Sequence, residues 1–482
     1  MRAAAAVALW RLADSTAVDA LVRHDHDPDR EVRWRVIWAL EKVVKPGVIV
    51  LRAALLLEDP DPQLRAAAVR TIGRQKHSRG TAYALTALGD ADVNVAVNAI
   101  RALQLIGDTT CAACGTALLA PLGHHDPYLR VTAATALADP FAWAHADSAA
   151  RHAMHDALRA HLADPDAATR GASARALLVR DGAAALPLVE PLLQDSSVYT
   201  RVAVLEGMRK LPSSAGVGRL LEPRLEPSRH LFERMTAADV LGERKEPGAA
   251  ARLRAGLADS SLLYVAACAS ALGTAGDTAS APLLVQAYAR HAHDGDSDVR
   301  QSVLDALRGF GRTKLADSLD HASPAKVNTP ARYDDEFFRG PAERGAILHT
   351  SKGDIEWVFY RDEAPQTVRN FVRLARTGYF DGRSVHRVVP NFVIQDGDPT
   401  GTGSGGPGYT IRCEYNRLHY DAGMVGMALS GKDTGGSQWF ITHSPQPHLD
   451  GRYTIFAHVV RGMDVVPRIV QGDQITRVEI LP

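Results

Sequence analysis

Residues 1–320 place apolar side chains at the period of an α-helix. In the segment 61–73, for example, Leu64, Ala68 and Ile72 follow one another at intervals of four, which puts them on one helix face. The polar residue before such a segment, often Asp, can cap the start of the helix. An apolar stretch ahead of it, such as residues 48–59, supplies a partner helix. This part of the chain is therefore predicted to consist of helical hairpins.

The same pattern recurs nine times, and an arginine marks the same position in most copies. The nine segments are 29–40, 61–73, 90–103, 126–137, 166–177, 197–208, 230–242, 261–273 and 296–311. The arginine column, at spacings of 29 to 40 residues, runs through Arg33, Arg65, Asn94, Arg130, Arg170, Arg201, Arg234, Tyr264 and Arg300. Helical hairpins stack into a solenoid at this period. The arginines could pair with Asp residues of their own repeat or of a neighbouring repeat, and the pattern leaves both open.

The repeated pattern resembles the HEAT-repeat family. The resemblance implies an all-α HEAT-like solenoid over residues 1–320, whose concave face binds a protein partner that the sequence does not identify. By this register Met1 lies inside a repeat, because Arg2 falls 31 residues before the next arginine of the column. Arg11 and Asp14 interrupt the apolar start too early for a signal peptide. Whether the natural array begins upstream, and whether the protein is cytoplasmic or exported, both stay open.

The pattern changes after residue 320. Residues 321–345 contain Pro, Gly and charged residues without periodicity, which is typical of a linker. Residues 346–482 are richer in Gly, aromatic and β-branched residues. The elements expected there are a hairpin at 346–360, a helix at 364–378, several short strands, a second helix near 462–470 and a last strand near 475–481. Many short strands with two helices predict a closed antiparallel β-barrel whose ends the helices cover.

The strand-like run SVHRVVPNFVIQDGDP, residues 384–399, carries Arg387 and Gln395 among apolar residues. Burying a charged side chain in a core strand costs free energy unless a partner group compensates the charge. A side chain that has a function can also justify this cost. One interpretation is an edge strand from which Arg387 reaches into water. The other is the wall of a cleft, with a polar pair set among apolar contacts.

The surrounding sequence favours the cleft. Three blocks in order, VHRVVPNFVIQDGDPTGTGSGGPGY, GMALSGKDTGGSQWFIT and HLDGRYTIFAHVVRGMDVV, resemble the central blocks of the cyclophilins, which are peptidyl-prolyl cis-trans isomerases. The resemblance covers residues 346–482 and implies a cyclophilin-like isomerase domain that acts on X–Pro bonds of client proteins. It makes Arg387 the catalytic arginine and Gln395 the residue that orients it and the substrate carbonyl. The residues that it places against the peptide are Phe392, Val393, Ala428, Leu429, Ser430, Gln438, Phe440, His448, Leu449 and Tyr453.

This chemistry fits the residue types. The barrier of about 18–20 kcal/mol comes from amide resonance, and no covalent bond is broken. A donor aimed at the prolyl nitrogen therefore suffices, and no metal, nucleophile or cofactor is expected. The alternative is a non-catalytic module that binds proline segments while the array serves as an assembly platform. Retention of Arg387, Phe392, Gln395 and Phe440 together argues against it.

Four positions depart from the pattern that is best known in the family. Val393 stands where Met is usual, and Leu429 replaces a common Asn. His448 occupies the position of a frequent Trp, and Tyr453 that of a frequent His. These departures predict weak binding of cyclosporin more than a loss of catalysis.

Composition excludes several other classes of function. Lys plus Arg and Asp plus Glu both number 55, so nucleic acid and anionic membrane are poor candidate partners. No apolar run is long enough to span a bilayer. The four cysteines are too few for a disulfide framework. Cys111 and Cys114 form a C-x-x-C, for which a zinc site or a redox pair is conceivable. The second half of a zinc spacing is missing, so we expect the two to pack as small side chains in an Ala-rich helix.

Overall fold

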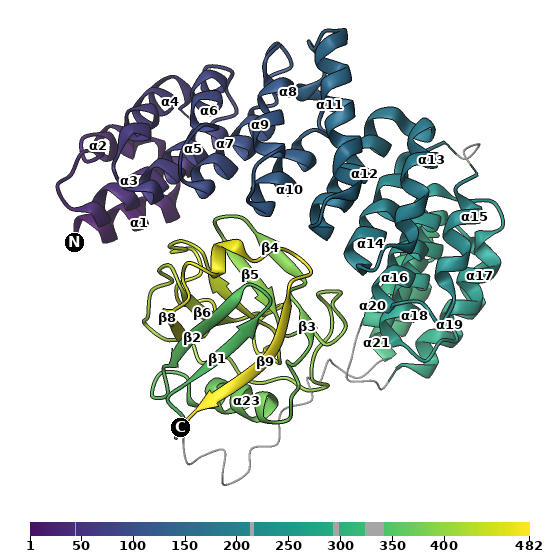
Figure 1. Cartoon of the computed structure of the whole chain (residues 1–482). Helices are drawn as coiled ribbons and strands as arrows, with labels where there is room; N and C mark the ends of the chain where they lie inside the picture. Colours follow the sequence, from purple (N-terminus) through teal and green to yellow (C-terminus); the bar gives the residue numbers. More distant parts are fainter. Residues whose placement is uncertain (44, 213–215, 293–297, 323–341) are drawn as a thin grey trace.

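The chain folds into a helical array followed by a β-sheet domain (Figure 1). The computed structural model describes residues 1–43, 45–212, 216–292, 298–322 and 342–482. Most of the expected linker, 323–341, and the first residues of the ninth repeat segment lie outside these ranges. No helix among the described residues is both long and apolar enough to cross a membrane.

The array is a double row of helices, as the periodicity predicts. The inner row faces the sheet domain in Figure 1 and comprises α1 (Arg2–Leu12), α3 (Arg30–Lys42), α5 (Pro62–Arg74), α7 (Val93–Ile106), α10 (Pro127–Ala136), α12 (Ala167–Asp181), α14 (Val198–Gly207), α16 (Leu231–Arg244), α18 (Leu262–Ala275) and α20 (Asp298–Gly309). The partner helices are α2 (Val18–Val22), α4 (Pro46–Leu55), α6 (Gly80–Ala87), α8 (Cys114–Ala117), α9 (Leu119–Leu122), α11 (Ser148–Ala160), α13 (Leu186–Val189), α15 (Gly218–Leu221), α17 (Ala249–Gly256), α19 (Ala281–Arg290) and α21 (Thr313–Ala322). Nine inner helices, α3 to α20, coincide with the nine predicted repeat segments.

The arginine column forms a ladder between neighbouring repeats, which settles the pairing that the sequence left open. Arg170 Nε lies 2.7 Å from an oxygen of Asp195, in the loop that leads to the next inner helix. Its Nη1 donates to the Asp164 and Pro165 carbonyls of its own loop. The equivalent pairs are Arg65–Asp90, Arg130–Asp164, Arg201–Glu233 and Arg234–Asp259. Each arginine thus joins one repeat to the next.

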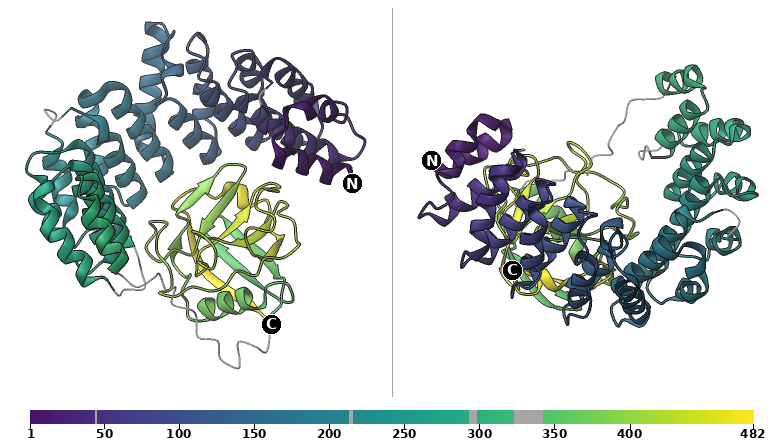
Figure 2. Two further views of the ribbon diagram at one scale, coloured as in Figure 1. Left: turned by 180° about the vertical axis from the view of Figure 1, so that it is seen from behind. Right: turned by 90° about the horizontal axis from the view of Figure 1, so that it is seen from above.

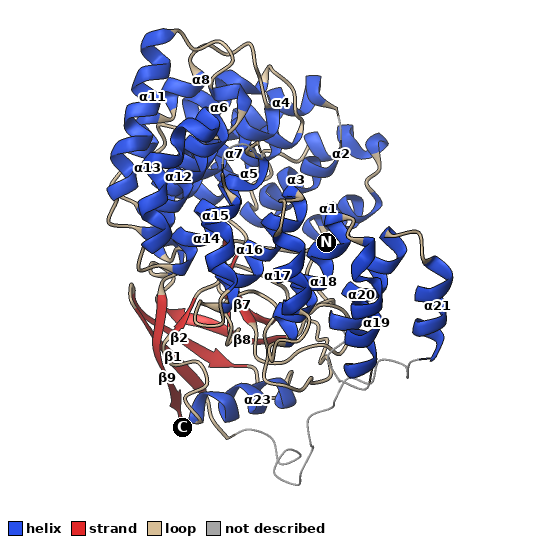
Figure 3. Cartoon of the chain, turned by 90° about the vertical axis from the view of Figure 1, so that its right-hand side faces the viewer, coloured by secondary structure: helices blue, strands red, loops and turns tan. Residues whose placement is uncertain are grey.

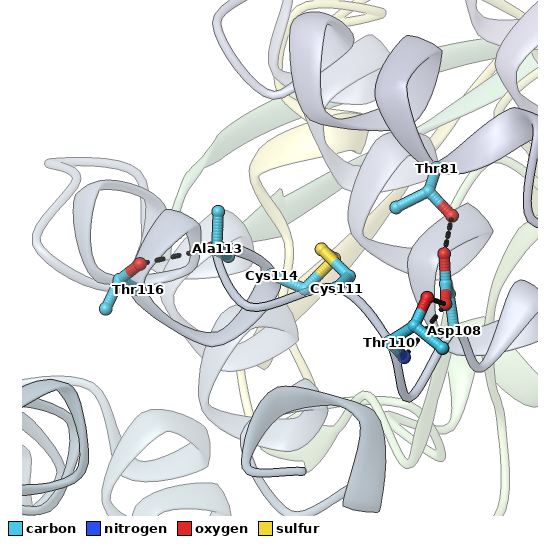
Figure 4. The surroundings of a disulfide bond; sticks show 7 residues. All are labelled: Thr81, Asp108, Thr110, Cys111, Ala113, Cys114 and Thr116. Carbon is cyan, nitrogen blue, oxygen red and sulfur yellow. Dashed lines mark hydrogen bonds between the residues drawn. A yellow bond between two sulfur atoms is a disulfide. The ribbon is translucent and has the colours of Figure 1, made fainter. Parts of the chain in front are cut away.

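Cys111 and Cys114 are joined by a disulfide bond at the start of α8 (Figure 4). The expectation that they pack as separate side chains within a helix is wrong. Residues 107–113 form a turn, in which the C-x-x-C spacing brings the two Cα atoms to 5.5 Å, within bridging range. Asp108 holds this turn, because its carboxylate accepts hydrogen bonds from Thr110 and from the Thr81 hydroxyl of α6.

The C-terminal part is a single antiparallel sheet that curls around a buried core (Figure 3). Its strands are β1 (Gly345–Thr350), β2 (Gly353–Phe359), β3 (Arg383–Ser384), β4 (Arg387–Val389), β5 (Val393–Asp396), β6 (Met424–Met427), β7 (Trp439–Thr442), β8 (Ile455–Arg461) and β9 (Gln474–Leu481). The expected hairpin and last strand are β1–β2 and β9, and the expected first helix is α23 (Pro365–Arg376). Trp357, Phe371, Trp439 and Phe456 meet ring against ring in the core.

Two expectations for this part need correction. The closed barrel is not confirmed: the strand order is β3-β9-β1-β2-β8-β6-β7-β5-β4, and the end strands β3 and β4 do not pair among the described residues. Both end strands are very short, and Pro390 directly after β4 has no N–H with which to extend the ladder. The expected second helix shrinks to a 3-10 turn, η11 (Val466–Arg468), because Pro467 lacks an N–H for a further helical bond.

The sheet domain lies within the curve of the array, as two opposite views show (Figures 1 and 2). Arg35 of α3 pairs with Asp421 at 3.4 Å, and Arg101 of α7 donates to the Pro390 carbonyl at 3.1 Å. Farther along, Tyr199 of α14 lies against Gly472, where an added Cβ would come within 3.1 Å of its ring. All three array residues belong to the inner row, so the concave side of the array holds the sheet domain.

Candidate active site

Arg387 and Gln395 are paired across the hairpin that β4 and β5 form. The hairpin turn breaks the strand-like run at Pro390–Asn391, and the register places the two residues directly opposite each other. Arg387 Nη1 donates to Gln395 Oε1 at 2.9 Å, and Gln395 Nε2 donates to Gln438 Oε1 at 2.9 Å. Gln438 Nε2 in turn donates to the carbonyls of Gly403 and Gly405. The arginine is therefore held by a row of amides anchored in the glycine-rich loop.

The guanidinium of Arg387 keeps its charge available. Its side chain reaches solvent, and among the described residues no carboxylate forms an ion pair with it. Partial burial lowers its pKa, and Tyr453 acts in the opposite direction. It also lies 5.9 Å from the centre of the Phe392 ring. The exposed N–H groups of the Arg387 guanidinium can therefore donate hydrogen bonds to a ligand bound next to Phe392.

A cluster of apolar side chains adjoins this row; it is the proline-ring pocket that the resemblance implies and is called the apolar pocket below. Val393, Phe440 and Leu449 are at most 6% exposed and pack together with Tyr420 and Ile455. The partly buried side chains that pack against this cluster include Phe392, Ala428 and Tyr453. Tyr453 meets Phe440 edge-on at 5.8 Å, and Tyr420 stacks on its other side at 5.5 Å. Apolar side chains of this kind suit contact with a compact apolar ring.

The remaining predicted residues divide between two hollows on either side of the pocket. A cavity of about 790 Å³ is lined by Gln395, Ala428, Leu429, Ser430 and Gln438. The Ala428 N–H is already bonded to the Gln438 carbonyl, which fixes this edge. Phe392 and His448 stack at 5.6 Å and line a second cavity of about 630 Å³. The twelve predicted residues therefore lie along the β4–β5 hairpin, in the apolar cluster and at the edges of two separate cavities.

The structure adds residues that the sequence analysis missed. Ser444 and Gln446 both donate to the Asn391 carbonyl and so fix the turn that carries Phe392. Tyr420 forms the floor beneath Phe440. These residues lie in loops without periodicity, so no pattern marks them. On the array side, Leu263 borders one hollow and Trp10 the other.

Comparison with known proteins identifies the family. Residues 346–481 match the family described as cyclophilin type peptidyl-prolyl cis-trans isomerase, and residues 49–114 match HEAT repeats. A peptidyl-prolyl cis-trans isomerase of Synechococcus elongatus is 49% identical over 138 residues, which are 28% of this chain and 95% of that protein. The chain belongs to the cyclophilin family. Its C-terminal part, called here the cyclophilin domain (346–482), is a peptidyl-prolyl cis-trans isomerase domain.

A second curated relative is similar to this chain over the same length. Peptidyl-prolyl cis-trans isomerase B of Bacillus subtilis is 48% identical over 138 residues, which cover 28% of this chain and 96% of that protein. A crystal structure of a cyclophilin type isomerase from Cryptosporidium parvum is 31% identical, with a TM-score of 0.28, and covers 29% of this chain and 98% of that one. The 28% of this chain that each of the two curated relatives matches is about the length of the cyclophilin domain.

His443 behind the cleft predicts a loss of stability in acid. Its imidazole is buried, neither ring nitrogen has a hydrogen-bond partner among the described residues, and burial lowers its pKa from 6.5 to about 4. Because the unfolded chain binds a proton more readily, the stabilisation is complete above pH 6.5 and is lost as the pH falls from 6.5 to 4. The full loss is about 3 kcal/mol, since one pKa unit corresponds to about 1.36 kcal/mol.

Urea unfolding of the cyclophilin domain at pH 7 and pH 4.5 checks this expectation. His443→Phe removes the titrating ring, so its free energy of unfolding should fall less between the two pH values than that of the unmodified domain. An equal fall in both proteins would rule out His443 as the cause.

Proposed function

We propose that Arg387 catalyses the cis–trans isomerisation of X–Pro bonds and that Gln395 positions it. The observation that carries the proposal is the hydrogen-bonded row from Arg387 through Gln395 to Gln438 beside a buried apolar pocket. As an amide twists, its nitrogen lone pair becomes localised and accepts a hydrogen bond that the planar amide cannot. A guanidinium fixed at the cleft edge stabilises that twisted state more than either planar ground state.

The other cleft residues hold the substrate in this proposal. Phe392, Val393, Phe440 and Leu449 enclose the proline ring, and Tyr453 closes the pocket beside Phe440. The backbone of Ala428, Leu429 and Ser430 pairs with the extended peptide, and Gln438 borders the same hollow. Proline-containing segments of client proteins are thus the substrates.

We also propose that the chain divides into three functional parts. Residues 1–320 are a scaffold that binds proteins, 321–345 are a linker, and 346–482 are the isomerase domain. Supporting this division, hydrophobic clusters of the array and of the cyclophilin domain are largely separate.

Expression of the two parts tests the division. Residues 346–482 alone should fold into a β-rich domain that isomerises a proline peptide, and residues 1–320 should give a strongly helical circular dichroism spectrum. An elongated profile in small-angle X-ray scattering is expected for the array. Failure of either piece to fold would refute the boundary.

His448 predicts weak inhibition by cyclosporin. An indole at this position would offer a bound cyclic peptide a larger apolar contact and an N–H donor. Losing several tens of Å² of buried area costs about 1–2 kcal/mol, or roughly tenfold in affinity. His448→Trp should therefore strengthen inhibition about tenfold, whereas turnover of a short proline peptide should change little.

The measurement is the inhibition constant for the unmodified domain, His448→Trp and His448→Phe. The Phe variant separates the added apolar area from the N–H donor. Tight inhibition of the unmodified domain would show that the contact at this position is dispensable.

A further inference from the structure

The cavity beside Phe392 is closed on its far side by the array rather than by the cyclophilin domain. Its volume is about 630 Å³. From the cyclophilin domain come Phe392 and His448, which form the outer wall of the apolar pocket. From the array come inner-row residues, among them Trp10, Trp38, Glu41, Arg70, Arg74 and Arg101. A ligand in this cavity would touch both domains at once.

Two polar contacts between the array and the cyclophilin domain hold the array next to this cavity. Arg101 is half-buried and donates to the Pro390 carbonyl, two residues from Phe392. Arg35 pairs with Asp421 across the same boundary. Burial lowers the pKa of His448, and the positive charge of Arg70 on the array lowers it further because the two side chains are near each other. The cavity is therefore part of the assembled chain.

Aromatic rings run in contact with one another from Phe392 to the core of the array, where Trp38 is buried beneath Trp10. Phe392 and His448 stack at 5.6 Å, His448 and Trp10 lie 6.2 Å apart, and Trp10 stacks on Trp38 at 4.2 Å. Flat rings accept the backbone and apolar side chains of a peptide without demanding a particular sequence. A peptide chain leaving the pocket past Phe392 would pass over His448 and Trp10.

The array wall carries an excess of positive charge. Arg70, Arg74 and Arg101 face one acidic residue, Glu41, which is within 3.1 Å of both Arg70 and Arg74. Arg70 Nη2 is buried and has no hydrogen-bond partner in the part of the chain that the structure describes. Arg101 forms no ion pair among the described residues, and burial together with Arg74 and Arg70 lowers its pKa. Two guanidinium groups are thus incompletely paired next to the cavity.

We propose that this cavity is the second half of the client-binding site and takes an acidic side chain of the client polypeptide. The carboxylate would receive hydrogen bonds from Arg70 and Arg101, whose planar forks match its geometry. The acidic residue would lie on the side of the proline opposite the Ala428–Ser430 edge. The array would then select clients for the domain that it holds. This inference rests on the proposed function.

Two matched pairs of peptides test it on the intact chain. In one pair a short spacer and two identical residues follow a single proline, and in the other pair they precede it. Within each pair the two residues are Asp in one peptide and Asn in the other. The readout is kcat/KM for isomerisation, measured by NMR exchange. The unmodified chain should favour the Asp peptide of one direction about tenfold, the effect of one charge-assisted hydrogen bond.

Variants locate the source of this preference. In the double variant Arg70→Gln and Arg101→Gln, the ratio of the two kcat/KM values should fall to about one. The control is Arg159→Gln on the partner helix α11, which should retain the preference. If the double variant fails to fold, the ratio of kcat/KM for the Asp and Asn peptides on the unmodified chain still tests whether a client carboxylate is recognised.

The possible failures are distinct. Equal acceleration of the Asp and Asn peptides by the unmodified chain would overturn the inference and leave the isomerase intact. A preference that survives the double variant would also overturn it, because the carboxylate would then be recognised elsewhere. Acceleration of neither peptide would instead contradict the proposed function.

Discussion

Replacement of Arg387 by alanine is expected to lower kcat/KM for a proline peptide by about 10²- to 10³-fold. This is the loss seen when one preorganised donor is removed from a transition state. The fold should persist, because the side chain reaches solvent and the one side-chain hydrogen bond that it makes within the described ranges is to Gln395. The measurement is NMR exchange of the peptide, with thermal unfolding measured in parallel.

Two further variants make this test specific. Arg387→Lys keeps the charge but loses the planar fork, so its activity should lie between those of the unmodified and alanine proteins. Arg468→Ala removes an exposed arginine that pairs with Asp464 away from the cleft and should leave turnover unchanged. Unchanged turnover in a folded Arg387→Ala protein would refute the catalytic assignment.

Replacement of Glu233 by alanine is expected to destabilise the array by about 3–5 kcal/mol. Its side chain is 1% exposed and accepts hydrogen bonds from Arg201 at 2.8 Å and Arg224 at 3.1 Å. Removing it leaves two largely buried guanidinium groups without a counter-charge, and breaking a buried ion pair on one side carries a cost of this size. Urea unfolding followed by circular dichroism measures the change.

The matched control is Glu226→Ala. Glu226 pairs with Arg252 in the same region, but both side chains are about half exposed, so the loss should stay below about 1 kcal/mol. Equal and small effects of the two substitutions would show that the arginine ladder does not hold the repeats together.

The repeats could be predicted from the sequence because each one repeats a local pattern. Helix starts follow from Asp caps such as Asp61 and Asp92, whose side chains accept the expected backbone hydrogen bonds. The pairing of the arginine column could not be predicted, since one Arg has an Asp of its own repeat and one of the next repeat within reach. Stacking of the hairpins decides between them.

The cleft could be predicted because its residues fall within three contiguous sequence blocks. Closure of the barrel could not, since it depends on whether two very short strands at the ends of the sheet meet. The disulfide between Cys111 and Cys114 depends on a turn where an Ala-rich sequence indicates helix. The contact of Trp10 with His448 joins opposite ends of the chain, and no local pattern carries that information.

The most direct test of the account is the exchange rate between the cis and trans forms of a short X–Pro peptide, with and without the intact chain. The uncatalysed process takes tens to hundreds of seconds at 25 °C. The account predicts rapid exchange at a catalytic amount of the unmodified protein and a rate near the uncatalysed one with Arg387→Ala. Binding of the peptide without any acceleration by the unmodified protein would contradict it.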